Sequence, residues 1–376
     1  MAEAMNYIDR LVAELCPDGV EYRPLGDVVE YAKKREKDGA GVQLYVGVEN
    51  LKSDFLGCSP VSGSKGGIIF QKDDILLGNI RPYLKKMWIS NTEGVSSPDV
   101  LVLRIQENEK ENMVAKYLYY VLSSGKFVAY NISHSRGGKM PRGNKAKILE
   151  FELPIPPLEI QEAIVEILDK FTNLEAELEA ELEARTLQYE YYRDSLFEAL
   201  DCPRVPLDSF AKIKNGKTYK DFGAGNIPVY GSGGIMTYVD RFAYDKPTVL
   251  IPRKGSLGNL FYLEEPFWNV DTIFYTEIDE EQVIPKFLYY FLKTAHLEDL
   301  NTAGGVPSLT QKVLNKVLIP VPSLEEQQRI VDILDRFDAL TSSLSEGLPA
   351  ELAARRSQYE YYRDQLLSFP RKGENQ

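Results

Sequence analysis

The residue types that usually carry catalysis or bind metals are few in this chain and lie far apart. The two histidines, His134 and His296, belong to different segments and have no metal-ligand neighbours in the sequence. Cys16, Cys58 and Cys202 form neither a CxxC pair nor a disulfide framework. The glycine runs lack the GKS or GKT of a phosphate-binding loop, and no GxGxxG opens a helix after a strand. The sequence therefore predicts no enzyme, no metal and no cofactor.

Basic and polar residues gather in segments that follow expected strands. Residues 79–86 (NIRPYLKK) and 252–256 (PRKGS) each follow a strand signal, and residues 131–149 hold five Lys or Arg and no acid. Lys and Arg pair with phosphates or guanine edges, and Asn and Gln read adenine. We therefore expect DNA contacts there, although each residue alone also fits an ordinary solvated surface. The candidates are Asn79, Arg81, Tyr83, Lys85, Lys86, Arg136, Lys139, Arg142, Lys145, Lys217, Tyr219, Arg253, Lys254, Ser256, Thr310 and Gln311.

The total charge argues against binding a polyanion, but its distribution removes the objection. The chain carries a formal net charge of −12. Residues 158–201 hold 13 acids and 3 bases, and residues 323–367 hold 9 acids and 5 bases. The remainder therefore carries a net charge of +2. Local charge, not the total, decides where a polyanion docks.

An internal repeat organises the chain. Residues 154–174 (PIPPLEIQEAIVEILDKFTNL) match residues 320–340 (PVPSLEEQQRIVDILDRFDAL) at an offset of 166, and QYEYYRD at 188–194 recurs unchanged at 358–364. Residues 196–206 after the first QYEYYRD correspond to the N-terminal residues 11–17 and 22–27, so the N-terminus supplies what the second copy lacks. This circular order predicts a pseudo-twofold fold with its two ends close together.

Both copies of the repeat show a helical pattern. Apolar residues recur at the i, i+3, i+4 spacing from Ile164 to Leu174, and a proline precedes each helix. The second copy holds four extra residues, with Gly347 and Pro349 among them, so we expect a kink or break there. The repeated tyrosines favour helix packing or partner binding over base stacking. The candidate partner-binding residues are Gln161, Gln188, Tyr189, Tyr192, Gln327, Gln358, Tyr359 and Tyr362.

The segments between the helices carry strand signals punctuated by glycine-rich turns. Strands are expected at 42–48, 74–77, 100–105, 249–252 and 272–278, and apolar helices at 117–122 and 287–292. The two segments share this frame but little other sequence, which suits one fold that reads two different things. We expect an N-terminal helical segment at 1–22, globular domains at 23–157 and 202–322, spacer helices at 158–201 and 323–369, and a tail at 370–376.

The duplicated PxPxLxxQxxIVxILDxF, the later QYEYYRD, and the NIRPYLKK and PRKGS segments resemble the specificity subunits of type I restriction-modification systems, over essentially the whole chain. The resemblance implies an α+β fold with two mixed α/β target-recognition domains, separated by two long helices that pair as an antiparallel coiled coil. It implies a non-catalytic subunit that binds double-stranded DNA, reads a bipartite target and recruits two methyltransferase subunits and the ATP-dependent restriction subunits. Because the two domains differ, we expect an asymmetric target.

Two alternatives stay open. A type IIB-like or fused restriction system would keep the same readers with other partners. A coiled-coil scaffold with protein- or sugar-binding domains would show no salt-dependent DNA binding. No apolar run approaches a membrane span and no leader pattern opens the chain, so a cytoplasmic protein without membrane association is expected.

Overall fold

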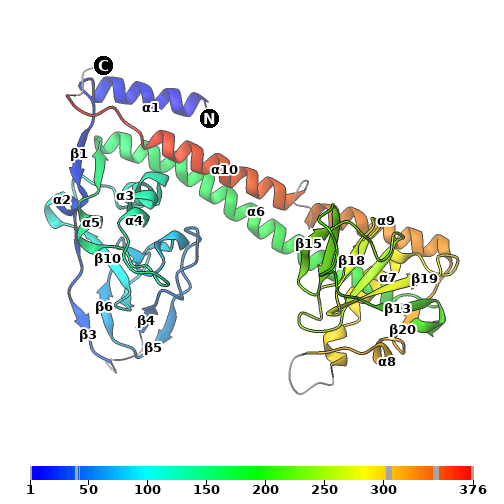
Figure 1. The fold of residues 1–376 in the computed structure, drawn as a ribbon. Helices are drawn as coiled ribbons and strands as arrows, with labels where there is room; N and C mark the ends of the chain where they lie inside the picture. The colour runs from blue at the N-terminus through cyan, green and yellow to red at the C-terminus, as the bar shows by residue number, and fades with distance from the viewer. Residues whose placement is uncertain (1, 39–40, 42, 302–306, 342–346, 374–376) are drawn as a thin grey trace. The chain divides into compact units, whose positions relative to one another are not determined.

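The computed structural model describes residues 2–38, 41, 43–301, 307–341 and 347–373. The chain divides into two compact units (Figure 1). Unit 1 comprises Met1–Glu177 and Leu352–Gln376, and unit 2 comprises Leu178–Glu351. Both ends of the chain therefore belong to unit 1.

Unit 1 is built around a four-stranded antiparallel sheet in the order β2-β10-β7-β8. A five-stranded sheet, β3-β6-β9-β4-β5, and the pair β1-β11 complete it. The central strands are apolar on both faces because helices cover one face and the second sheet the other. The strands are β1 Glu21–Pro24, β2 Val29–Tyr31, β3 Arg35–Glu36, β4 Gln43–Val46, β5 Val61–Gly63, β6 Gly67–Phe70, β7 Ile75–Gly78, β8 Met87–Ile89, β9 Gly94–Ser96, β10 Val100–Ile105 and β11 Glu152–Ile155.

Five short helices complete the globular part of unit 1: α1 Ala2–Leu15, α2 Leu25–Val28, α3 Ala115–Ser123, α4 Gly125–Ser133 and α5 Lys145–Leu149. The apolar helix expected at 117–122 is α3, and it places Tyr117, Leu118 and Val121 in the main core. The same core receives Ile160, Ile164 and Leu168 from the first turns of the next long helix. The i, i+4 spacing of these residues thus buries one face of that helix.

Unit 2 repeats the central sheet with the order β13-β19-β16-β17, but its second sheet has three strands, β15-β14-β18. The four-stranded sheets are equivalent, so the shared frame expected from the sequence is the central sheet. The second sheets differ, as the dissimilar sequences require. The elements are β12 Arg204–Pro206, β13 Ala211–Asn215, β14 Ile227–Gly231, β15 Gly234–Val239, β16 Thr248–Pro252, β17 Phe261–Leu263, β18 Trp268–Asn269, β19 Ile273–Ile278, α7 Pro285–Thr294, α8 Gln311–Leu314 and β20 Leu318–Pro320.

Three longer helices carry the repeated sequence: α6 Leu158–Glu198, α9 Leu324–Thr341 and α10 Leu348–Leu366. The second copy is thus two helices, as the extra residues predicted. Gly347 has a φ of +83°, and a Cβ there would lie 2.5 Å from the carbonyl oxygen of Ala339. Only glycine fits this left-handed turn over the end of α9.

In each unit α6 packs against one helix of the second copy, and the same residue types meet. In unit 1 the ring of Phe171 lies 6.3 Å from Tyr359 and 6.0 Å from Tyr362. In unit 2 the ring of Phe337 lies 6.4 Å from Tyr189 and 5.9 Å from Tyr192. The α6 and α10 segments run antiparallel, because Phe171 meets Tyr362 while Glu175, one turn later, pairs with Arg356.

A buried glutamine fastens each domain to its helix. Gln161 accepts a hydrogen bond from Val114 N (2.9 Å) and donates to the carbonyl oxygens of Asn112 (2.9 Å) and Pro156 (2.8 Å). Gln327 makes the equivalent bonds in unit 2. Both side chains are 0 % exposed. Their amides therefore supply partners that the chain entering α3 or α7 would otherwise lack.

An aspartate makes a second fastening point, two helical turns further on. In unit 1, Asp169 accepts a hydrogen bond from Tyr120 and forms an ion pair with Lys116 (2.7 Å). In unit 2, Asp335 accepts from Tyr290 and pairs with Lys286 (2.8 Å). Burial raises the pKa of both phenols, and the adjacent carboxylate adds to the effect, so each tyrosine remains a donor.

The two chain ends meet in unit 1, as the circular repeat predicts (Figure 1). Val20 N donates to Pro370 O (2.8 Å), and Lys372 N donates to Val20 O (3.0 Å). Gly19, at φ +88°, lies so close to the C-terminal segment that a Cβ would stand 2.7 Å from the carbonyl carbon of Arg371. The N-terminal and C-terminal segments thus form one joint.

Candidate nucleic-acid interface

In unit 1 two basic loops that are distant in sequence lie side by side. The loop after β7 meets the loop before α5, because Arg81 N donates to Pro141 O (2.7 Å) and Gly143 N donates to Asn79 O (3.1 Å). Arg136 and Arg142 exchange two backbone hydrogen bonds of 2.8 Å, which closes residues 136–142 into a tight turn. Asn144 then caps α5 through its side-chain oxygen. Two of the predicted segments therefore form one surface.

The side chains of this surface differ in accessibility. Tyr83 is 49 % exposed, and Arg136, Lys139, Arg142 and Lys145 are exposed. Arg142 also forms a 2.9 Å ion pair with Asp99. Arginines and lysines in exposed turns can reach phosphates or groove edges without moving the backbone.

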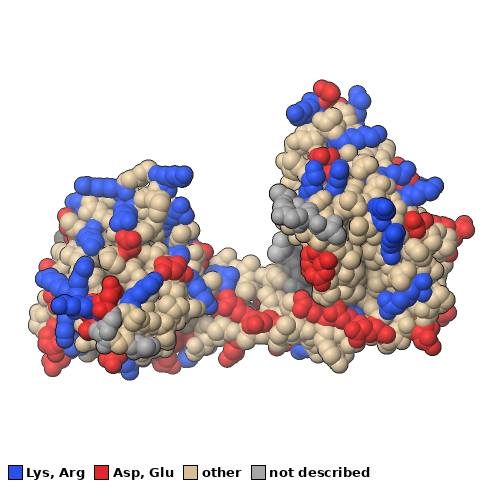
Figure 2. Space-filling view, turned by 90° about the horizontal axis from the view of Figure 1, so that it is seen from below, with Lys and Arg blue, Asp and Glu red and all other residues tan. Residues whose placement is uncertain are grey.

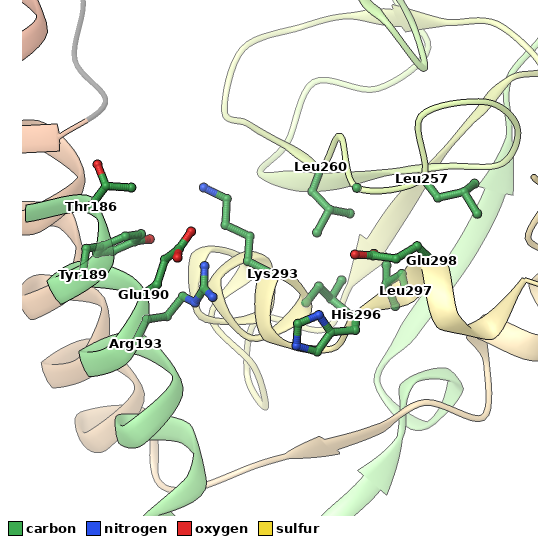
Figure 3. A pocket seen from close by; sticks show the side chains of 12 residues that line it. Thr186, Tyr189, Glu190, Arg193, Leu257, Leu260, Lys293, His296, Leu297 and Glu298 are labelled. Atoms are coloured by element: carbon green, nitrogen blue, oxygen red, sulfur yellow. The ribbon is translucent and has the colours of Figure 1, made fainter. Parts of the chain in front are cut away.

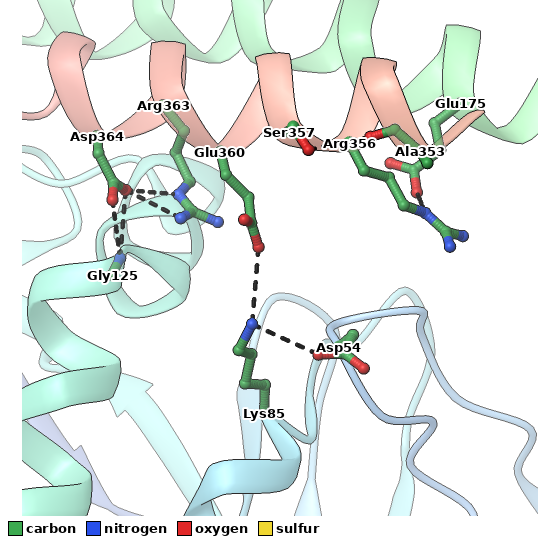
Figure 4. A network of polar contacts seen from close by, with 10 residues as sticks. All are labelled: Asp54, Lys85, Gly125, Glu175, Ala353, Arg356, Ser357, Glu360, Arg363 and Asp364. Atoms are coloured by element: carbon green, nitrogen blue, oxygen red, sulfur yellow. Dashed lines mark hydrogen bonds and ion pairs between the residues drawn. The ribbon is translucent and has the colours of Figure 1, made fainter. Parts of the chain in front are cut away.

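Three predicted residues of the first loop have structural positions instead. Asn79 is 7 % exposed, so it cannot reach a base edge. Lys85 Nζ lies 3.5 Å from Asp54 and 3.6 Å from Glu360 of α10 (Figure 4). Lys86 Nζ donates to Val48 O at 2.8 Å. We leave these three residues out of the interface because Asn79 is buried and the chain itself binds the amino groups of Lys85 and Lys86.

Unit 2 brings together the equivalent pair of loops. The loop after β16 meets the loop before α8, because Leu309 N donates to Arg253 O (2.9 Å) and Gly255 N donates to Pro307 O (3.1 Å). Lys254 pairs with Ser308 through a backbone bridge. Thr310 caps α8 as Asn144 caps α5. The same two loops thus meet in both units with different side chains.

Of the other predicted residues of unit 2, Arg253, Lys254 and Ser256 belong to the loop after β16, whereas Lys217 and Tyr219 follow β13. Lys254, Ser256 and Lys217 are exposed, and the guanidinium of Arg253 lies over the ring of Phe274. Lys217 N donates to Asn269 O (2.9 Å), which places its segment beside β18. Tyr219 is half-buried. The Gln311 amide donates inward to Ile213 O (3.2 Å), so Gln311 holds the loop and we leave it out of the interface.

The charged side chains are distributed as the counts of acidic and basic residues in the sequence predict. Figure 2 shows Lys and Arg side chains spread over both globular parts, while Asp and Glu gather along the part formed by the long helices. The acidic side chains are therefore concentrated on the helices, and the globular parts carry basic side chains that a polyanion could contact.

The predicted partner-binding residues fall into two groups. Gln161, Gln327 and Tyr189 are buried, and burial raises the pKa of Tyr189. Tyr359 packs on Phe171, and burial raises its pKa to about 12. These residues hold the chain's own elements together. The residues that reach the surface are Gln188, Tyr192, Gln358 and Tyr362.

Two exposed tyrosines were missing from the predicted set. Tyr191 is 70 % exposed and Tyr361 is 61 % exposed, and they occupy the same position in the two QYEYYRD copies. Each stacks edge to face on the next tyrosine, Tyr192 or Tyr362. Their helical position, one residue after the glutamate, separates them from the buried Tyr189 and the partly buried Tyr359.

A pocket in unit 2 lies beside the buried Tyr189 (Figure 3). Glu190 and Arg193 of α6 line one side, and Lys293 and His296 at the end of α7 line the other. The Tyr189 hydroxyl has no hydrogen-bond partner among the described residues. In unit 1 the corresponding glutamate, Glu360, is held by Lys85.

Neither a metal site nor a membrane span is found in the part of the chain that the structure describes. No group of three or more His, Cys, Asp or Glu side chains there is arranged to hold a metal ion. No described helix is both long and apolar enough to cross a membrane. All three cysteines are free thiols.

The family of the type I restriction modification DNA specificity domain matches the chain twice, at residues 17–184 and 201–354. The chain is 31% identical to the EcoR124I/EcoR124II specificity subunit of Escherichia coli, over 98% of each chain. It is 30% identical to a putative type I restriction enzyme specificity subunit of Haemophilus influenzae, over 93% of this chain and 96% of the relative. The chain therefore belongs to the family of type I restriction-modification specificity subunits.

Solved structures share the fold. A chain from a structure concerning complex assembly and conformational transition of the type I R-M system superimposes with a TM-score of 0.64 at 18% identity, over 93% of this chain and 97% of that one. The S subunit from M. genitalium gives a TM-score of 0.54 at 19% identity, over 93% and 96%. The α+β fold with two domains joined through long paired helices, implied by the resemblance, is thereby confirmed.

Proposed function

We propose that the loop pair of each unit reads one half of an asymmetric, bipartite target in double-stranded DNA. In this proposal the target-recognition domains cover residues 23–157 and 202–322, and residues 158–201 and 323–369 space them. The chain itself catalyses nothing. It directs methyltransferase subunits, and for cleavage ATP-dependent restriction subunits, to the site.

One observation carries the proposal: both domains join the same two loops by corresponding backbone hydrogen bonds, and in both the loop after the central strand is basic. Gly143 N bonds to Asn79 O in unit 1, and Leu309 N bonds to Arg253 O in unit 2. A shared backbone frame fixes where side chains project, whereas different side chains select different bases. Tyr83, Arg136, Lys139 and Arg142 stand in the first loop pair, and Arg253, Lys254 and Ser256 in the second.

The helices supply the proposed partner surface. Gln188 and Gln358 are half-buried, and each accepts a hydrogen bond from an arginine one turn earlier, Arg185 or Arg355. The exposed Tyr191 and Tyr361 follow on the same helices. Exposed tyrosines are typical of protein interfaces. Because each copy presents the same set, the surface suits two identical methyltransferase subunits.

The test is long-read sequencing of modified bases in the host, with and without this gene. We expect a split, asymmetric motif to lose its methyl group on deletion. Next, Arg136→Ala and Arg253→Ala are compared with Lys72→Ala and Lys246→Ala. Each control lysine precedes the strand, β7 or β16, whose far end carries the basic loop. This strand of four or five residues separates each control lysine from the basic loop by about 13–17 Å.

We expect the loop variants to lose methylation by about fivefold or more, since each removes a contact worth about 1–3 kcal/mol. The controls should stay at the wild-type level. Unchanged methylation on deletion, or equal losses in loop and control variants, would refute the proposed function. A scaffold with other ligands predicts that result.

A further inference from the structure

We propose that one exposed methionine in each domain, Met140 in unit 1 and Met236 in unit 2, makes apolar contact with bases of its half-site and so helps to determine which bases are read. This inference rests on the proposed function.

The methionines of the globular domains divide sharply. Met87 and Met113 are core residues, at 0 % and 4 % exposed, whereas Met140 is 52 % and Met236 is 58 % exposed. An exposed methionine loses the burial that stabilises one in a core. Single exposed apolar residues are common. Here, however, Met140 lies within the basic loop before α5, and Met236 lies in a hairpin tied to the basic loop after β16.

In unit 1, Met140 stands at the tip of the turn that Arg136 and Arg142 close. Pro141, the next residue, accepts the backbone hydrogen bond from Arg81 (2.7 Å) that joins the two loops. Lys139, the residue before, is exposed. Gly137, at φ +101°, allows the tip to turn. Met140 is therefore an exposed apolar residue within a turn that also carries Arg136, Lys139 and Arg142.

In unit 2, Met236 lies in β15 of the β14–β15 hairpin, which contacts Thr272 beside the basic loop. Its sulfur lies 2.8 Å from the position that a Cβ on Gly231 would take, and Thr272 Oγ1 lies 3.4 Å from the same position. Thr272 O accepts hydrogen bonds from Arg253 N (2.9 Å) and Lys254 N (3.3 Å), and Thr272 Oγ1 accepts from Ser232 N (3.2 Å). Thr272 thus ties the hairpin that carries Met236 to the basic loop.

The surroundings favour DNA over a protein as the occupant. Met140 lies in a turn that also carries Arg136, Lys139 and Arg142. The hairpin of Met236 is tied through Thr272 to the loop of Arg253 and Lys254. A phosphate backbone would neutralise these cations. An unbranched thioether fits irregular apolar surfaces. Between phosphate-bound cations, the apolar surfaces that duplex DNA offers are thymine methyl groups and base faces. The two methionines come from different structural elements in the two domains, as expected where each domain reads its own bases.

The test measures specificity with the complete complex. Met140→Gln and Met236→Gln preserve side-chain length and remove the apolar end. Each purified complex is assayed for methylation of duplexes that carry every single base-pair change in both half-sites. Leu318→Gln is the matched control, since Leu318 is also 52 % exposed but lies in the separate β12–β20 pair.

We expect each methionine variant to lose discrimination by about tenfold at one or two neighbouring base pairs. The two variants should affect opposite half-sites, and Leu318→Gln should change none. Three results would overturn the inference. They are unchanged discrimination between duplexes, a uniform loss of methylation over all duplexes as for a phosphate contact, or failure of the methyltransferase to co-purify with the methionine variants. If deletion of the gene leaves methylation intact, the proposed function itself fails, so the two failures are distinguishable.

Discussion

Substitution of Gln327 by methionine tests whether a buried amide fastens the globular part of unit 2 to α9. The wild-type side chain is 0 % exposed and satisfies Ile284 N (2.8 Å), Gln282 O (2.9 Å) and Pro322 O (2.9 Å). Methionine has a similar length but cannot replace these bonds. Ile284 N precedes α7, where no local side chain caps the helix. The variant therefore leaves an orphan donor at the start of a core helix.

The expected loss of stability follows from the backbone groups that the variant leaves without a hydrogen-bond partner. Gln282 is exposed, so its carbonyl can bind water. Ile284 N–H and Pro322 C=O, both at half-buried residues, then remain, and such a polar group without a partner costs about 1–3 kcal/mol. We expect the free energy of unfolding of unit 2 to fall by about 2–4 kcal/mol. At one decade per 1.4 kcal/mol, exchange of protected amides in α7 should accelerate by about 30-fold or more.

Hydrogen exchange read by mass spectrometry is the assay, because a two-unit chain need not unfold in one step. Gln161→Met should produce the same effect in unit 1 while leaving unit 2 unchanged. Gln328→Met is the control, because that neighbouring glutamine is exposed and bonds only Asp332 within the helix. If Gln327→Met accelerates α7 exchange no more than Gln328→Met, the fastening role is refuted.

Two further predictions concern unit 1. Gly19→Ala should lower the free energy of unfolding by more than Gly57→Ala. Both glycines have a φ of +88°, and this left-handed strain costs each variant about 1 kcal/mol, but only at Gly19 would the Cβ also collide with backbone, at Arg371. Limited proteolysis near residue 370 should therefore rise for Gly19→Ala alone, and equal proteolysis of the two variants would contradict the joint between the chain ends. Glu109→Gln should destabilise the protein by about 1–3 kcal/mol at neutral pH, since Glu109 accepts bonds of 2.8 and 3.1 Å from Arg23. The hydrogen bond from Arg23 lowers the pKa of Glu109. The contribution of Glu109 to stability is therefore present above the ordinary glutamate pKa and is lost as the pH falls through the lowered pKa. The urea midpoints of wild type and variant should then converge in acid, and midpoints that stay apart would contradict this reasoning.

The sequence predicted much of the fold because the informative signals are local or repeated. Strands expected at 100–105 and 249–252 are β10 and β16, whose residues are almost all apolar. The helix break was predictable because Gly347 and Pro349 interrupt an otherwise duplicated pattern. Residue type did not separate Tyr191 and Tyr361 from the other repeated tyrosines, because the period of the helix decides which tyrosines are exposed.

By itself the sequence determined the duplication, the circular order, the helices and strands, and the basic character of the loops. Each of these follows from residue identity at a constant offset or from spacing along the chain. Only the tertiary structure decided that residues 79–81 meet 136–143, that Gln161 and Gln327 are interior bonds, and that Lys85 is held by Glu360 of α10. Those facts depend on hydrogen bonds and ion pairs between residues far apart in the chain, and no local pattern specifies the partner of a polar group.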